Sequence, residues 1–426
     1  MLEKRLHDVF GNRLKTIGQV ADVICGPFGS AITNKDYQET GIPLIRITNI
    51  SKNGYMDYSD LIYISEELGD SLSRTQVSKG DIVISQRGSL GQCAIIDNKF
   101  GKLNISANII AVKNFKGISA DFVRNYILSS IGQTLLERAS SGQVQQKITT
   151  QDIASMIIPV GCDEEKLSEI IRKAHSDYED KIDKAEETLK NFGKEIICSC
   201  KLNNESNNKL CYAIKLCQLD GVIDAKRYIS IGNIGHALTI DGICDIVECK
   251  VNAFKLGTEV VDWIRIDDLP NQPIDISKVR TQPANEIEGT FFEVAKGDIL
   301  VARLGPTILN QKIVMVRKTE RKTIASAEFL VLRCKKGVNP EAVMAILKTA
   351  YYRDIMYAHA RGSTPSRYRL NREDMLKLPF PDILAKQEYW ANKSIEIRKA
   401  VKKLRSEAER DWQQARKQFE KELLGE

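Results

Sequence analysis

One stretch, residues 163–194, strongly constrains what this chain can fold into. Its apolar side chains recur at steps of three and four, and most positions between them are charged. The apolar positions are Leu167, Ile171, Ala174, Tyr178, Ile182, Ala185, Leu189 and Phe192. This spacing predicts a helix of about 45 Å, at ~1.5 Å per residue, with a narrow apolar stripe on one side. Such a helix needs a partner that covers the stripe.

A second stripe near the end of the chain offers that partner. It begins at about residue 384 and is also surrounded by charged residues. Its apolar positions are Trp390, Ile397, Val401, Leu404, Ala408, Trp412, Phe419 and Leu423. Because the two helices have similar lengths, we predict that they pair as a coiled coil. The alternative is two unrelated surface helices.

The segments outside these helices repeat. Lys79-Gly80-Asp81-Ile82 returns as Lys296-Gly297-Asp298-Ile299, at an offset of 296 − 79 = 217. Four further matches follow in the same order at nearly the same offset, and together they indicate a duplication. They pair Ile45-Arg46-Ile47 with Ile264-Arg265-Ile266, Ser106-Ala107 with Ser326-Ala327, Gly142 with Gly362, and Asp152 and Pro159 with Asp374 and Pro381.

Each repeated body contains short β-type runs followed by a helical segment, so the predicted fold class is α+β. In the first body we expect strands at 19–25, 44–50, 81–86, 93–96 and 105–112, and a helix at 119–138. The predicted order is body, long helix, body, long helix, with bounds 1–160, 161–200, 201–383 and 384–426. Arg46 and Arg265 lie on predicted strands, where we expect salt bridges at the edge of the core.

Composition narrows the class of protein. No run of eighteen apolar residues occurs in the 426-residue chain, so we expect no membrane span. The N-terminus lacks an apolar signal core, and none of the ten cysteines forms a C-x-x-C pair. These features predict a cytoplasmic protein with reduced thiols and no zinc site. The net charge of +6 fits both a nucleic-acid-binding protein and an ordinary soluble one.

Catalytic motifs are missing from the sequence. None of the four histidines has a ligand spacing, no G-x-x-x-x-G-K-[ST] loop occurs, and no Asn/Asp-Pro-Pro-aromatic motif of amino-methyltransferases is found. We therefore expect no catalytic residue and no bound metal or cofactor in this chain.

Two pairs of equivalent polar segments are candidates for binding DNA, since arginine and glutamine can contact phosphates and base edges in the major groove. The first pair is a polar loop in each body and the second is the bend after each Lys-Gly-Asp strand. For the loops the candidates are Ser141, Gln143, Gln145, Gln146 and Lys147, then Arg361, Ser363, Thr364, Ser366, Arg367, Tyr368 and Arg369. For the bends they are Gln86, Arg87 and Ser89, then Arg303 and Thr307. The alternatives are exposed loops and tight turns without a ligand.

This pattern resembles the specificity subunit of Type I restriction–modification enzymes, which defend cells against foreign DNA. The resemblance rests on the duplicated Lys-Gly-Asp-Ile strands, the glycine-containing polar loops, and the Ile158-Pro159 and Phe380-Pro381 exits into the long helices. It implies two tandem α/β target recognition domains separated by long helices that pair antiparallel. It also implies a non-catalytic subunit that reads a bipartite, asymmetric site on double-stranded DNA.

The family's partners follow from the same resemblance. They are methyltransferase subunits, which the helices would dock, and motor–nuclease subunits. S-adenosylmethionine, ATP and Mg are then expected on those partners and not on this chain. Two alternatives stay open: a coiled-coil scaffold that does not contact DNA, and a solitary DNA-modifying enzyme. At the first exit Gly161-Cys162-Asp163 departs from the family's pattern, whereas Gln387 fits it in the second.

Overall fold

The computed structural model describes residues 2–27, 29–87, 91–140, 147–202, 238–247, 250–276, 278–364 and 367–426. The chain divides into two compact units. Unit 1 contains residues 1–181 and 407–426, and unit 2 contains residues 182–406. The two long helices α7 (Glu164–Ser199) and α14 (Gln387–Leu424) each contribute one half to each unit.

The described residues of unit 1 form two four-stranded sheets and one two-stranded pair. The first sheet is antiparallel, in the order β2 (Asp22–Cys25), β9 (Ile109–Lys113), β6 (Ile82–Ser85) and β7 (Cys93–Ile95). The second has the order β4 (Ile62–Ile64), β3 (Ile42–Ile45), β8 (Leu103–Ile105) and β5 (Gln76–Val77), with β3 and β8 parallel. The pair is β1 (Leu14–Thr16) with β10 (Ile157–Pro159). The helices besides α7 and α14 are α1 (Leu2–Phe10), α2 (Ile17–Val20), α3 (Glu66–Ser71), α4 (Ala120–Leu128), α5 (Ser130–Ser140) and α6 (Thr150–Ser155).

Unit 2 repeats this plan. Its antiparallel sheet has the order β12 (Cys244–Ile246), β20 (Phe329–Cys334), β17 (Ile299–Ala302) and β18 (Ile313–Met315). A mixed sheet has the order β13 (Lys250–Asn252), β16 (Thr290–Val294), β19 (Thr323–Ser326), β14 (Val260–Ile264) and β15 (Arg280–Pro283), with β14 and β19 parallel. The pair is β11 (Leu238–Thr239) with β21 (Pro379–Phe380). The helices besides α7 and α14 are α9 (Ile240–Ile243), α10 (Gly305–Leu309), α11 (Pro340–Leu347), α12 (Ala350–His359) and α13 (Arg372–Lys377).

Equivalent hydrogen bonds confirm the duplication and explain the repeated Lys-Gly-Asp turn. A carboxylate oxygen of Asp81 accepts from the backbone N–H of Ser78 at 2.9 Å, and Asp298 accepts in the same way from Ala295 at 2.8 Å. Each aspartate is buried and closes the turn that leads into β6 or β17. The repeated aspartate is therefore required for the local fold.

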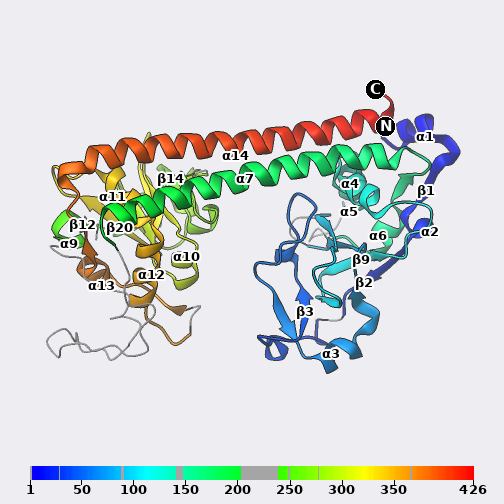
Figure 1. Ribbon diagram of the computed structural model, residues 1–426, viewed down its shortest axis with the longest axis horizontal. Coiled ribbons are helices and arrows are strands. Elements are labelled where there is room, and N and C mark those ends of the chain that lie inside the picture. The colour runs from blue at the N-terminus through cyan, green and yellow to red at the C-terminus, as the bar shows by residue number, and fades with distance from the viewer. Residues whose placement is uncertain are drawn as a thin grey trace. The chain divides into compact units, whose positions relative to one another are not determined.

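Helices α7 and α14 run antiparallel, as predicted, and lie side by side within each unit (Figure 1). In unit 1 the Nζ atoms of Lys166 and Lys181 lie 2.8 and 2.7 Å from carboxylate oxygens of Glu422 and Asp411. The order of these pairs along the two helices is reversed, which shows the antiparallel direction. In unit 2 the rings of Phe192 and Trp390 pack with their centroids 6.4 Å apart. The predicted stripes are thus covered by each other and by the bodies.

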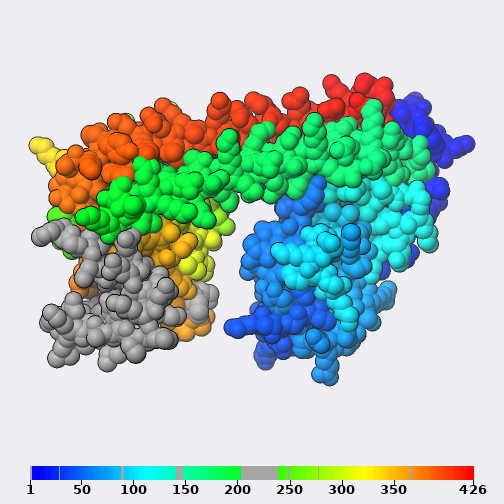
Figure 2. Space-filling model, viewed as in Figure 1, coloured from blue at the N-terminus to red at the C-terminus, as the bar shows by residue number. Residues whose placement is uncertain are grey.

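The C-terminal half of α14 completes the core of unit 1. Trp412 and Phe419 are buried in one cluster with residues of α1, α4 and the start of α7, including Leu6 and Tyr126. Figure 2 shows the end of α14, in red, against the N-terminal helix α1, in dark blue. Arg5 and Glu426 form an ion pair there.

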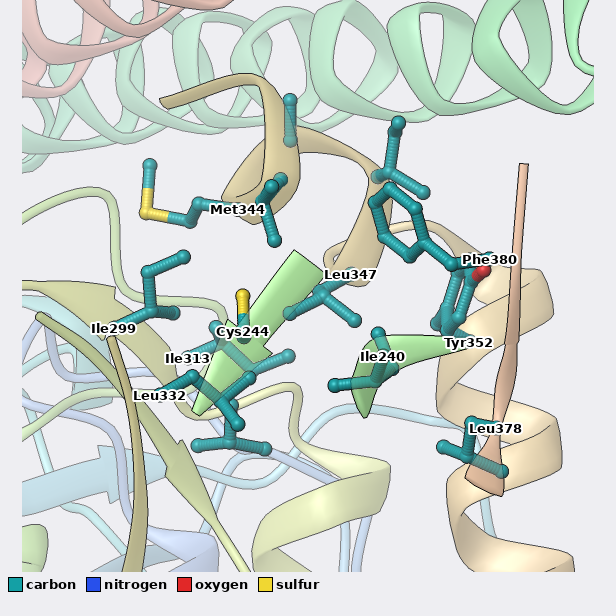
Figure 3. Packing of buried hydrophobic residues seen from close by; sticks show 14 of the residues in the cluster. Ile240, Cys244, Ile299, Ile313, Leu332, Met344, Leu347, Tyr352, Leu378 and Phe380 are labelled. Carbon is teal, nitrogen blue, oxygen red and sulfur yellow. The ribbon is translucent and has the colours of Figure 1, made fainter. Parts of the chain in front are cut away.

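The N-terminal half of α14 closes the core of unit 2. This core surrounds the β12–β20–β17–β18 sheet, and Figure 3 shows Ile299, Leu332 and Met344 packed in it. Ser394 donates to the buried carboxylate of Glu341 on α11 at 2.8 Å, and Arg398 forms an ion pair with it. Apolar packing and a buried ion pair therefore both attach α14 to α11.

An aromatic stack joins the body of unit 1 to both long helices. The Tyr55 and His175 rings are stacked with centroids 3.3 Å apart, and Trp412 meets His175 edge-on at 6.2 Å. The Arg124 guanidinium lies over Tyr55, 4.5 Å from its centroid. Burial, with the Arg124 charge nearby, lowers the pKa of His175 to about 4.

Four predicted elements of the first body have clearly different bounds in the structure. The strand expected at 19–25 begins only at Asp22, since Ile17–Val20 forms helix α2. The strand expected at 44–50 ends at Ile45, because the Asn49 side chain accepts from the Arg46 N–H and closes a 3-10 turn. The run at 105–112 splits into β8 and β9 around a turn in which Ile109 donates to Ser106. The helix expected at 119–138 breaks at Ser129, whose hydroxyl donates to Tyr126 and accepts from Gly132.

Arg46 and Arg265 do form ion pairs, at 2.9 Å to Asp60 and 2.8 Å to Asp267. No helix in the described ranges has both the length and the hydropathy that a membrane span requires. The polar, asparagine-rich stretch at 201–210, which the sequence predicts to be a linker, lies outside the described residues from 203 onward.

Candidate nucleic-acid interface

Two polar segments of unit 2 that are distant in sequence come together in the structure. The bend after β17 contains Arg303 and Gly305. Tyr368 lies near the end of the polar loop, and Leu370 directly follows it. The Gly305 N–H donates to the Tyr368 carbonyl at 2.7 Å, and the Leu370 N–H donates to the Arg303 carbonyl at 2.8 Å. The predicted bend and loop therefore form one surface.

The polar loop folds back on itself at its base. Arg361 and Arg369 exchange both backbone hydrogen bonds, at 3.0 and 2.8 Å. Between them, the Arg367 N–H donates to the Thr364 carbonyl at 2.8 Å. A Cβ atom at Gly362 would lie 2.4 Å from the Arg367 carbonyl oxygen, so this close approach requires glycine. The arginines are thus held on a compact loop.

The loop presents its arginines to solvent. Arg361, Arg367 and Arg369 are all exposed, as are the hydroxyl residues Ser363 and Thr364. Exposed guanidinium groups can neutralise phosphates or donate two hydrogen bonds to guanine. This part of the surface has the chemistry that DNA binding requires.

Two carboxylates balance part of this positive charge. An Nη atom of Arg369 lies 2.8 Å from Glu328, and Arg361 lies 3.4 Å from Asp374. The Glu328 carbonyl also accepts from the Arg303 N–H at 3.1 Å. Glu328 therefore holds the Arg303 backbone through its carbonyl and pairs with the Arg369 guanidinium through its carboxylate.

Three candidate residues of unit 2 have structural contacts of their own. Arg303 is half-buried, and its Nε atom has no hydrogen-bond partner among the described residues. The Thr307 hydroxyl donates to the Leu304 carbonyl at 2.7 Å. The Tyr368 ring packs near that of Tyr357, with 5.9 Å between centroids. The unpartnered Nε atom of Arg303 is itself buried.

Unit 1 has the same backbone frame with different side chains. Gln86 occupies the place of Arg303, because its N–H donates to Asn108 at 3.0 Å and its carbonyl accepts from Ile148 at 3.1 Å. The Gln86 side chain is buried, however, and donates to Cys25 Sγ at 3.1 Å. Its side chain therefore points into the protein and is not available at the surface.

The other candidates in unit 1 are only partly described. Arg87 is exposed and Lys147 is half-buried. Ser89, Ser141, Gln143, Gln145 and Gln146 lie outside the described residues, as does Ser366 in unit 2. The described ranges contain no cluster of three or more metal-binding side chains.

Comparison with known proteins relates the first part of the chain to a family. The family model described as the Type I restriction modification DNA specificity domain matches residues 12–192. The resemblance found in the sequence is confirmed. The match covers less than half of the chain, and it shows what residues 12–192 are similar to. The matched residues contain β1 to β10 and most of α7.

The chain is also similar to one curated protein and to several solved structures. The EcoBI specificity subunit of Escherichia coli is 28% identical over 147 residues, which are 34% of this chain and 30% of that protein. Among solved structures, the S subunit from M. genitalium is similar at a TM-score of 0.39, with 11% identity over 96% of this chain and 95% of that one. The HsdS subunit from Thermoanaerobacter tengcongensis is similar at 0.33, with 12% identity over 97% and 96%.

The family match ends at residue 192, so the assignment of unit 2 depends on the duplication. Hydrogen bonds of unit 1 recur in unit 2, including Ile17 to Met156 at 2.9 Å and its equivalent, Ile240 to Leu378, at 3.0 Å. Unit 2 thus repeats the fold plan of unit 1.

Sequence reasoning missed the acidic residues beside the arginine loop. Glu328 follows Ser326-Ala327, which is one of the repeated motifs, and Asp374 is itself a repeated position. The repeat could have drawn attention to both residues. It could not show that their carboxylates lie beside arginines.

Proposed function

We propose that this chain is a non-catalytic DNA specificity subunit of a Type I restriction–modification complex. The single observation that carries the proposal is the shared frame of the two candidate surfaces. In each unit the strand after the Lys-Gly-Asp turn is hydrogen-bonded to the end of a polar loop, through Gln86 and Ile148 or through Arg303 and Leu370. The frame is the same, while the side chains it presents differ.

One frame with two sets of side chains supports a bipartite, asymmetric DNA target. Each unit would act as a target recognition domain for one half of the site. Phosphate contacts would set the position on the duplex, and base-edge contacts would select the sequence. In unit 2 we assign these contacts to Arg303, Arg361, Arg367 and Arg369, with Ser363 and Thr364. In unit 1 we assign them to Arg87, Lys147 and the polar loop.

The long helices would serve as spacer and as the docking surface for methyltransferase subunits. Motor–nuclease subunits would complete the complex. S-adenosylmethionine, ATP and Mg would then be bound by those partners, since this chain carries no motif for binding them. We place the complex in the cytoplasm.

Co-purification with the cognate methyltransferase subunit, followed by mapping of methylated adenines, tests this proposal. We expect a gapped motif in two halves. Exchanging unit 2's loop residues 361–369 for those of another family member should change only one half. Failure to bind the methyltransferase subunit and duplex DNA would favour the coiled-coil scaffold. Methyl transfer by the purified chain alone would favour a solitary enzyme.

A further inference from the structure

Two cysteines of unit 2 face each other across neighbouring strands. Cys244 on β12 and Cys334 on β20 are directly opposite in the antiparallel register, although 90 residues separate them in sequence. Their Sγ atoms lie 3.5 Å apart. The fold therefore holds two free thiols in contact.

The register of the strands favours a bond between these thiols. Lys335 donates to Ile243 and Val247 donates to Val331, both at 2.9 Å. Because hydrogen-bonded pairs alternate along an antiparallel ladder, Cys244 and Cys334 form a non-hydrogen-bonded pair. Such pairs have Cα atoms about 4.5 Å apart, inside the roughly 4.4–6.8 Å range of disulfides. Small side-chain rotations would bring the sulfurs together.

The two thiols differ in their access to solvent. Cys244 is completely buried beside Ile313 and Leu332, as Figure 3 shows. Its hydrogen bond with Cys334, together with burial, raises the pKa of the Cys244 thiol. Cys334 is half-buried. A dissolved oxidant therefore reaches Cys334 first, and Cys244 is positioned as the second thiol.

We propose that Cys244 and Cys334 form a reversible disulfide when the protein meets an oxidised low-molecular-weight disulfide. The Cys334 thiolate attacks one sulfur of that molecule, forming a mixed disulfide and releasing the other half as a thiolate. Cys244 loses its proton and attacks Cys334 Sγ, which displaces the second half. The two protein thiols are oxidised, and the small disulfide is reduced to two thiols.

The disulfide bond would attach the edge strand β12 covalently to β20. β12 lies at one edge of the β12–β20–β17–β18 sheet, so the cross-link would prevent its separation from β20. Long closed loops gain most from such a bond, because it restricts the unfolded chain. Cys334 ends β20, whereas Glu328 directly precedes that strand. The thiol pair is thus at the other end of β20 from the arginine loop, and the proposal is independent of DNA binding.

Oxidation of the purified full chain by glutathione disulfide tests the proposal. After free thiols are blocked with N-ethylmaleimide, digestion without reduction should yield a peptide that links Cys244 to Cys334. Two of the ten thiols should be lost and should return with dithiothreitol. The oxidised chain should also unfold several degrees higher than the reduced chain.

Single variants separate the two steps. Cys244→Ser should retain a glutathione adduct on Cys334 and form no cross-link. Cys93→Ser, which removes a buried thiol from unit 1, should cross-link like the unaltered chain. A stable adduct on Cys334 in the unaltered chain would overturn the proposal. So would the absence of any modification, or the pairing of either residue with a third cysteine.

Discussion

Arg369 and Glu328 form an ion pair at the edge of the arginine loop, with 2.8 Å between an Nη atom and a carboxylate oxygen. The same glutamate accepts from the Arg303 N–H through its backbone carbonyl. The loop, the bend and this carboxylate therefore form one unit of structure. Removing the negative charge would leave that backbone in place while freeing an arginine.

Glu328→Gln should bind duplex DNA more tightly than the unaltered chain. A partly exposed ion pair is worth about 0.2–1 kcal/mol, so we expect a gain of roughly 1.4- to fivefold at low salt. The dependence of affinity on salt should steepen by up to about one phosphate contact. Fluorescence anisotropy with a labelled duplex over a salt series measures both. Glu320→Gln, in an exposed pair with Lys318, is the control. Weaker binding by Glu328→Gln alone would contradict this role of the carboxylate.

Arg367→Ala should change which bases are accepted in one half of the target. The Arg367 side chain is exposed, and the Arg367 backbone N–H donates to the Thr364 carbonyl. Because the substitution keeps this backbone hydrogen bond, we expect the loop to remain intact. Loss of a bidentate hydrogen-bonded contact to a base lowers the discrimination against the other bases at that position by about 1–3 kcal/mol. Mapping of methylated adenines by the assembled complex measures this change. Assembly of the complex should be unaffected. Lys336→Ala, an exposed lysine of the same unit, should leave the motif unchanged. An identical motif in both variants would remove Arg367 from the interface.

Trp412→Ala should strongly destabilise unit 1. The Trp412 side chain is only 3% exposed, and it packs on His175 and Tyr178 of α7. Removal of such an aromatic side chain costs about 3–5 kcal/mol in the free energy of unfolding. Urea denaturation followed by circular dichroism measures the loss. Gln414→Ala, an exposed position on the same helix, should change stability by less than about 0.5 kcal/mol. Equal effects of the two variants would mean that α14 does not close this core.

His175 should make stability depend on pH between its unfolded and folded pKa values. Its pKa falls from the usual value of 6.5 to about 4 in the folded chain. The unfolded chain therefore binds more protons in this window, and stability is lost as the pH falls from about 6.5 to 4. A shift of this size corresponds to a loss on the order of 3 kcal/mol.

His175→Gln removes the titrating group and should flatten that pH dependence. Unfolding by urea at a series of pH values compares this variant with the unaltered chain. His7→Gln provides a matched control, since His7 lies on the exposed face of α1. If His175→Gln kept the full pH dependence, other groups would account for it.

The sequence predicted the large elements well because each depends on a repeated signal. The stripes of α7 and α14 recur over many turns, and the duplication presents the Lys-Gly-Asp turn twice. The breaks at Asn49 and Ser129 were missed because they depend on single side chains that bond to the backbone. The inward direction of Gln86 depends on Cys25, 61 residues earlier, and no local pattern records such a contact.

The candidate surface was predicted in part for the same reason. Arginine-rich composition identified the loop at 361–369, and the duplication identified the bend at Arg303. That the two segments share backbone hydrogen bonds is a property of the fold. The position of Glu328 beside Arg369 likewise requires the packing of β20 against β17.

Residues 407–426 fold as part of unit 1, although they follow unit 2 in the chain. Trp412 and Phe419 belong to the core of unit 1, yet the ribosome makes them after all of unit 2. At about 5–20 residues per second, the interval from Lys181 to Glu407 lasts roughly ten to fifty seconds. During translation the nascent first unit therefore carries an uncovered apolar face, and its folding finishes only when the final helix leaves the ribosome.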